Sequence, residues 1–352
     1  MKTIVHSKSF ADTLIPFLIA FAGISSINAS DIWQPTAEEQ EMLERINIAR
    51  QAPQTEAVRL GLPVDSVRKF INKTEYLPPL AWNTELATAA YNQNKRMVKD
   101  QYFSHRMADG TPFTTFCRNA GYGSGVYQNL AAGPEFNSGS DTHNAFFIDK
   151  NVNGEPHRQN IIEVKAKEIG MSRGIASGYY SRVWTVNFGL DQSCPPTALG
   201  VVWRDLNGNG IYDAGEGLPD VTVDITGPDG LNSVQTFRHG GYQLPVSTAG
   251  EYVISFSGGG ITEPIVKTVM IDNENVKVDA QVKMFDPSRA SLNLADPAAS
   301  RELMTQPANL GCVAPGGIVS QPPLFIPLGI ALLLMIYRRS SRMSLRSCRI
   351  SR

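Results

Sequence analysis

The sequence predicts an α+β domain followed by a small all-β domain, and three patterns carry this prediction. Apolar residues recur at helical spacing in the first hundred residues, and strand-like segments follow between residues 169 and 188. After residue 196, Gly and Pro turns separate further short alternating segments. Helices followed by strands around one core indicate a layered α+β sandwich.

Three helices are predicted in the first domain. Residues 37–50 follow Thr36 as an N-cap, and their apolar face is made by Met42, Leu43, Ile46 and Ala49. Asn83 or Thr84 caps a second helix, whose inner face carries Leu86, Ala89, Ala90, Gln93 and Met97. Residues 112–120 form a short third helix that ends at Gly121.

Strands complete both domains. Residues 169–173 and 183–188 read as strands of a first domain that spans residues 37–192, and one face carries Trp184, Val186 and Phe188. A β-sandwich over residues 197–284 is predicted from five alternating segments, 199–203, 221–226, 252–256, 265–271 and 276–282.

Both ends of the chain are predicted to be targeting segments. Lys2 and Lys8 precede a short apolar run that ends near Ala29, which is the pattern of a secretory signal peptide over residues 1–29. Residues 285–323 form a linker rich in Ala, Pro, Ser and Gly. Residues 324–337 are a short apolar transmembrane or sorting segment, and residues 338–352 form a tail with six arginines.

The basic tail predicts the location of the protein. By the positive-inside rule the arginines stay in the cytoplasm, so the body of the chain is exported to the cell envelope or the extracellular space. The last forty residues also resemble the sorting tails of bacterial envelope proteins, from which a protease removes the anchor. The apolar segment is short for a membrane-spanning helix, so a permanent membrane anchor and a processed tail both stay open.

The exported part is acidic. Residues 30–337 hold 24 basic and 32 acidic residues, a net charge of -8, whereas the whole chain has a net charge of -1. No basic stripe with interleaved aromatic residues occurs, and this argues against nucleic acid as a partner.

The four cysteines show no metal-binding spacing. Cys117 and Cys194 lie in the predicted folded part, and we predict a disulfide between them in an oxidising compartment. Cys312, just before the apolar segment, is either a processing or modification site or a free thiol.

Residues 205–216 fit a twelve-residue calcium loop. Gly210 provides the sharp turn at position six, and positions one, three, five, nine and twelve carry oxygen-bearing side chains. Because calcium takes six to eight oxygen ligands, we predict six protein ligands: Asp205, Asn207, Asn209, the carbonyl of Ile211, Asp213 and Glu216. The alternative is a glycine-rich hairpin without metal.

The flanks of this loop are strand-like, which places it on the β-domain and not between the helices of an EF-hand. Residues 202–223 look like the opening of the SD-repeat B-type (SdrD B-like) domains of bacterial surface proteins. This resemblance covers residues 197 to about 283 and implies a prealbumin-like or immunoglobulin-like sandwich with structural calcium.

Three short stretches carry a second resemblance, namely residues 103–106, 127–133 and 156–161. Together with the segments around them, they resemble the CAP superfamily (cysteine-rich secretory protein, antigen 5, pathogenesis-related 1), also called SCP domains, over residues 41–190. The resemblance implies an α-β-α sandwich with a surface cleft in which His105 and His157 face each other.

In much of this family two histidines and two acidic residues line the cleft, and some members bind zinc or another divalent ion there. Gln128 stands at one acidic position, and a neutral amide supplies neither an anionic ligand nor a general base. Asp149 and Glu155 are both candidates for the other position. We expect His105 and His157 to be hydrogen-bonding struts, and the alternative is a weak zinc site.

The resemblance implies a binding module for a lipid, a glycan or an envelope protein. A metal-dependent hydrolase or peptidase built on the two histidines and a structural adhesin are the alternatives. The sequence favours a non-enzymatic role, because Ser104 next to His105 does not make a nucleophile–base pair and no other nucleophile arrangement occurs. His143 matches no motif and is expected on the surface of a helix.

Overall fold

The computed structural model describes residues 33–71, 75–175 and 181–290. The predicted signal peptide, nearly all of the linker, the apolar segment, the basic tail and Cys312 lie outside these residues. Within the described residues, no helix has both the length and the apolar character needed to cross a bilayer.

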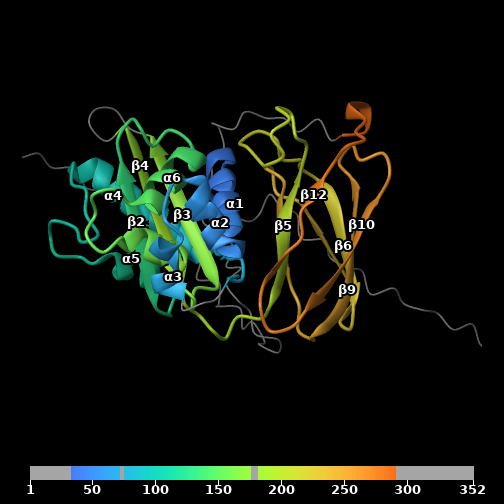
Figure 1. Ribbon diagram of the computed structural model, residues 1–352, viewed down its shortest axis with the longest axis horizontal. Coiled ribbons are helices and arrows are strands. Elements are labelled where there is room, and N and C mark those ends of the chain that lie inside the picture. The colour runs from blue at the N-terminus through green and yellow to red at the C-terminus, as the bar shows by residue number, and fades with distance from the viewer. Residues whose placement is uncertain (1–32, 72–74, 176–180, 291–352) are drawn as a thin grey trace, which may run out of the picture. The chain divides into compact units, whose positions relative to one another are not determined.

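A four-stranded sheet forms the centre of the first domain (Figure 1). Its strand order is β1 (Ala81–Trp82), β3 (Glu168–Ile175), β4 (Arg182–Gly189) and β2 (Val126–Ala132). β1 runs parallel to β3, and the other neighbours are antiparallel. β3 and β4 contain the two predicted strands, whereas β1 and β2 were not predicted.

Helices cover both faces of this sheet (Figure 1). On one face α4 (Thr84–Asp100) packs on β3 and β4, and α5 (Phe113–Asn119) packs on α4. The other face holds α1 (Ala37–Gln51), α6 (Gly139–Ile148) and α7 (Pro156–Ile161). Gly170 lets α4 approach closely, because a Cβ there would lie 2.3 Å from the backbone nitrogen of Ala87. The domain is therefore the predicted α-β-α sandwich.

The predicted caps explain where the two long helices begin. The Thr36 hydroxyl accepts the N–H of Glu39, whose carboxylate in turn accepts the N–H of Thr36. The Asn83 side chain accepts the N–H of Leu86 at 2.9 Å. A helix was expected around His143, and α6 is that helix. The short helices α2 (Pro53–Arg59), α3 (Asp65–Ile71) and α7 were not predicted, because six or seven residues show little periodicity.

The second domain consists of two sheets, one antiparallel and one mixed, around one apolar core. One sheet has the order β10 (Ile265–Ile271), β9 (Gly250–Gly258), β6 (Val221–Gly227) and β7 (Gly230–Gln235). In the other, β5 (Thr197–Trp203) pairs with β8 (Gly241–Pro245), β11 (Val276–Lys277) and β12 (Ala280–Gln281). A short 3₁₀ turn, η2 (Pro287–Arg289), follows. This is the predicted all-β domain.

Polar contacts connect the two domains. Lys277 Nζ lies 2.7 Å from Glu44 Oε2 of α1, and both side chains are almost fully buried. The side-chain amide of Gln243 accepts the N–H of Trp82 at 2.8 Å and donates to the carbonyl of Trp82 at 2.9 Å. The Asn275 amide donates to the carbonyls of two loops of the first domain. We call this set of contacts the domain junction.

The predicted disulfide between Cys117 and Cys194 is wrong, because Cys117 is a free thiol. Cys117 lies on α5 and packs with Leu86, Ala89 and Tyr122, so its side chain belongs to an apolar cluster beneath α4. Burial raises the pKa of this thiol to about 11. Cys117 behaves as a small hydrophobic core residue.

Candidate functional site

His105 lies against a cluster of neutral amides. Its Nδ1 is 2.9 Å from Gln128 Oε1, and Gln128 Nε2 donates to Gln93 Oε1 at 2.7 Å and to Asn187 Oδ1 at 2.8 Å. Because an amide oxygen only accepts, Nδ1 donates its proton to Gln128 Oε1. Gln93, Gln128 and Asn187 are buried. We call these three residues the amide cluster, and it carries no net charge.

His157 has a carboxylate partner. Its Nδ1 lies 2.8 Å from Asp149 Oδ1, and its backbone N–H donates to Asp149 Oδ2 at 2.9 Å. Asp149 is buried at the C-terminus of α6, in a left-handed backbone conformation that turns the chain towards α7. Glu155 instead pairs with Lys69. Of the two candidate acids, the structure therefore brings Asp149 to the histidine.

Strand β2 links the two histidines. Asn129, which follows Gln128, donates from its amide to the carbonyl of His157 at 3.0 Å. Asn160 of α7 donates to the carbonyl of Gln128 and to Asn129 Oδ1. Sequence reasoning missed the roles of Gln93, Asn160 and Asn187. Gln93 could have been found, since it is a polar residue on the apolar face of a predicted helix.

The cleft residues do not fit a catalytic zinc site. Such a site needs three protein ligands and one open position. Within the described parts of the chain, no three His, Cys, Asp or Glu side chains gather where they could hold a metal ion. Gln128 occupies one position with an amide, and Asp149 is engaged by His157. The cleft residues can therefore orient two imidazoles and form hydrogen bonds.

In the predicted calcium loop, two carboxylates accept hydrogen bonds from the backbone of the loop itself. Asp205 accepts the N–H groups of Gly208, Asn209 and Gly210 at 2.7–3.1 Å. Glu216 is buried and accepts the N–H groups of residues 206 and 213, at 2.9 and 3.0 Å. Gly208 and Gly210 both have a φ of 78°, which favours glycine. Positions one and twelve therefore set the shape of the loop.

The donor set of the loop fits calcium. The side-chain amides of Asn207 and Asn209 both donate to Asp213 Oδ2, at 2.7 and 2.6 Å, so the side chains at positions three, five and nine lie together. Three carboxylates, two amide oxygens and one carbonyl are hard oxygen donors of the number that calcium requires. In the described residues the carboxylates accept N–H donors and do not form a ready-made metal cluster.

Comparison with known proteins identifies both domains. Residues 43–188 match the family model of the cysteine-rich secretory protein family (CAP), and residues 198–303 match that of the SdrD B-like domain. The chain contains a CAP domain followed by an SdrD B-like domain. A search of the curated proteins found no match.

Solved structures include similar chains. One is an extracellular protein from Bacillus anthracis that contains an SCP domain, with 25% identity and a TM-score of 0.27, covering 36% of this chain and 37% of that one. Another is an outer surface protein from Borrelia burgdorferi, with 17% identity and a TM-score of 0.28, covering 40% of this chain and 93% of that one. This chain thus spans little more than a third of the length of the first.

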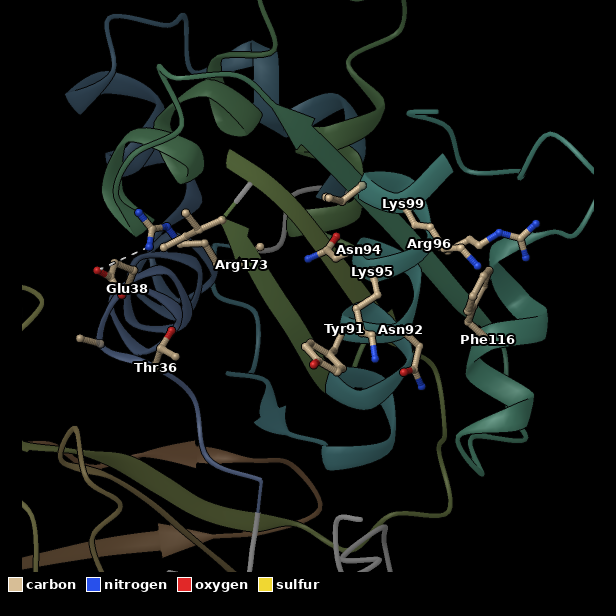
Figure 2. Close-up of a pocket in the computed structure, with 14 residues that line it drawn as sticks. Thr36, Glu38, Tyr91, Asn92, Asn94, Lys95, Arg96, Lys99, Phe116 and Arg173 are labelled. Carbon is tan, nitrogen blue, oxygen red and sulfur yellow. Dashed lines mark ion pairs between the residues drawn. The ribbon is translucent and has the colours of Figure 1, made fainter. Parts of the chain in front are cut away.

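A pocket of about 930 Å³ opens elsewhere on the CAP domain, between α1, α4, α5 and the end of β3 (Figure 2). Its apolar lining comes from Tyr91, Val98, Phe116 and Ile175. Lys95, Arg96 and Lys99 of α4 lie on one side, and Arg173 with Glu38 lies on the other (Figure 2). No sequence pattern predicted this pocket, because its walls come from four separate segments.

His143 is not on a helix surface as predicted. It is fully buried in α6, and its Nε2 lies 2.8 Å from Glu56 Oε1. Arg59 binds both oxygens of the same carboxylate, at 2.6 and 2.7 Å. Because α6 packs against α1 and lies near α2, the side of α6 that carries His143 faces the interior. This triad is an ionic cluster within the CAP domain, and we call it the Glu56 cluster.

Proposed function

We propose that the CAP domain binds an anionic amphiphile, such as a fatty acid or an acidic lipid, in the pocket between α1 and α4. The observation that carries this proposal is the combination of an apolar lining with a cationic rim around a volume of about 930 Å³. Pockets of roughly 300–1,000 Å³ that combine apolar walls with a few polar groups are typical of small-molecule sites.

The rim favours an anionic headgroup. Lys95 and Lys99 are four residues apart on α4, so they project from the same side of the helix. Both are exposed, and within the described residues neither forms an ion pair, whereas Arg96 binds Asp100 and Asp109. Two lysines at the mouth of an apolar pocket suit a carboxylate or phosphate headgroup above an acyl chain.

A fluorescent fatty acid tests this proposal. We expect dansyl-undecanoic acid to bind the full chain, and the double variant Lys95→Glu, Lys99→Glu to weaken binding at least tenfold through charge reversal. Ile175→Glu places a charge in the apolar mouth at an exposed position, where folding is insensitive to it, and weakens binding similarly. Lys267→Glu, on exposed β10, is the matched control and leaves binding unchanged. Equal affinity of all four proteins contradicts the proposal.

We further propose that the SdrD B-like domain holds calcium in the loop from Asp205 to Glu216. Calcium supplies a divalent charge that cross-links the oxygen donors of the loop. Because only the folded loop presents these donors together, calcium should raise the unfolding temperature of the full chain. A melting curve that a chelator leaves unchanged contradicts this proposal. Asp205→Ala removes position one and is expected to abolish the calcium effect.

The protein is proposed to be an exported component of a bacterial envelope. The support is the pattern of the N-terminal 29 residues and the apolar segment with its arginine tail. The SdrD B-like domain then separates the CAP domain from the membrane. Protease accessibility in intact cells tests this topology, and digestion of the CAP domain without lysis is the expected result.

A further inference from the structure

Arg45 of the CAP domain reaches the calcium loop of the SdrD B-like domain. Its Nη2 lies 2.5 Å from Asp213 Oδ1, and the side chain of Arg45 is only 9% exposed. Asp213 is position nine of the loop. Arg45 Nε is buried and lacks a hydrogen-bond partner in the described part of the chain. Asp213 stabilises the buried guanidinium, and Glu41 on the same helix adds a second carboxylate that interacts with it electrostatically.

Asp213 divides its two oxygens between the two domains. Oδ1 binds Arg45 of α1, whereas Oδ2 accepts the amides of Asn207 and Asn209 inside the loop. The guanidinium thus places a positive charge directly beside the point at which three predicted ligands converge. A cation from one domain already neutralises a carboxylate that the other domain offers to calcium.

We propose that Arg45 is a built-in counter-cation that lowers the calcium affinity of the loop, so that the CAP domain sets the calcium concentration at which the SdrD B-like domain loads. This inference rests on the proposed calcium loading. A unit positive charge roughly 6 Å from a divalent ion weakens binding by at least about tenfold, which is the value for the dielectric of water. Calcium loops of this type tune their affinity through the number of charges around them.

The coupling is reciprocal. If Arg45 weakens calcium binding, calcium weakens the Arg45–Asp213 contact by the same factor. The other contacts of the domain junction, Lys277 with Glu44 and Gln243 with Trp82, do not involve loop ligands. Calcium therefore loosens one edge of the junction and leaves the domains connected through the rest.

Calcium titration of the full chain by calorimetry tests the proposal. We expect Arg45→Met, which keeps the length of the side chain but removes its charge, to bind calcium about tenfold more tightly than the wild type. Arg45→Lys retains the charge and stays close to the wild type. Arg59→Met, which removes an arginine from an ion pair on α2, is the matched control and leaves calcium affinity unchanged. If Arg45→Met does not fold by circular dichroism, Arg45→Gln provides the same neutral comparison.

Two results overturn the proposal in different ways. Calcium binding by all variants with equal affinity, or weaker binding by the neutral variants, refutes the role of Arg45 while calcium loading stands. Weaker binding would show that Arg45 orients Asp213 for the ion. Absence of calcium binding in the wild type and in every variant refutes calcium loading itself, and this inference fails with it.

Discussion

The amide cluster in the CAP domain and the calcium loop in the SdrD B-like domain are both dense groups of polar side chains. In the amide cluster, the side chain of Gln128 forms hydrogen bonds with His105, Gln93 and Asn187. In the loop, Asp205 and Glu216 accept backbone N–H groups, and Asp213 binds a guanidinium from the other domain. The first group is complete within its domain and the second is not.

This difference indicates which of the two groups can attract a metal cation. Gln128 closes the cleft network through neutral hydrogen bonds and supplies no anionic ligand. The loop keeps two of its carboxylates, Asp205 and Asp213, partly exposed, where a cation can still compete for them. The predicted metal chemistry therefore moves from the cleft, which the family resemblance emphasised, to the loop and the domain junction.

The largest expected effect concerns the charged side of this comparison. Lys277→Met removes one partner of the nearly fully buried Lys277–Glu44 pair and should destabilise the protein by about 3–5 kcal/mol, because Glu44 stays buried without its cation, and Asp279 loses the same partner. Urea denaturation at pH 7 measures the loss. The double variant with Glu44→Leu should recover much of it, and a single variant as stable as the wild type would show that the junction is open in solution.

The second largest effect is expected from acid, which should reduce the stability that the Glu56 cluster contributes. Burial alone raises the pKa of Glu56, but hydrogen bonds from Arg59 and His143 outweigh it and lower that pKa to about 2. Because the unfolded carboxyl titrates near 4.5, this contributes up to about 3 kcal/mol at higher pH and is lost as the pH falls towards 2.

His143 extends this loss to milder acid. Burial lowers the pKa of His143 below its ordinary value of 6.5, so the unfolded state binds its proton first and stability starts to fall below that pH. The unfolding free energy measured from pH 7 to pH 2 checks both trends. Glu56→Gln should flatten the lower part of the curve, and an unchanged slope there would assign the acid sensitivity to other carboxylates.

A smaller effect tests the neutral side of the comparison. Gln128→Glu should destabilise the CAP domain by about 1–3 kcal/mol at pH 7, because Gln93 and Asn187 lose a donor and a carboxylate is buried. Tyr127→Glu introduces the same charge at the exposed neighbouring residue and should cost little. Equal unfolding free energies of the two variants in urea would mean that the amide cluster tolerates charge.

The smallest effect concerns Cys117. Because its thiol is buried and its pKa is raised to about 11, iodoacetamide at pH 8 should leave it unmodified in the native protein and modify it after denaturation. Mass spectrometry of the peptide that contains Cys117 separates it from the other cysteines. Rapid labelling without denaturant would show that α5 opens readily.

Local sequence patterns predicted much of the fold because they depend on neighbours along the chain. Thr36 and Asn83 start their helices, and Trp184, Val186 and Phe188 share one buried face of β4. Four of the five alternating segments after residue 196 are β5, β6, β9 and β10, whereas the fifth, 276–282, is divided into β11 and β12. The short helices α2, α3 and α7 have too few turns to show a period, and β2 was hidden inside a motif.

The sequence by itself determined the order of the two domains, the loop with its alternating oxygen donors, and the presence of Gln128 where an acid is common. Only the tertiary structure decided that His157 pairs with Asp149, that His143 is buried, that Cys117 is unpaired, and that Arg45 meets Asp213. The physical reason is sequence distance: a cap or a loop is built from consecutive residues, whereas Arg45 and Asp213 are 168 residues apart and meet only when two domains pack.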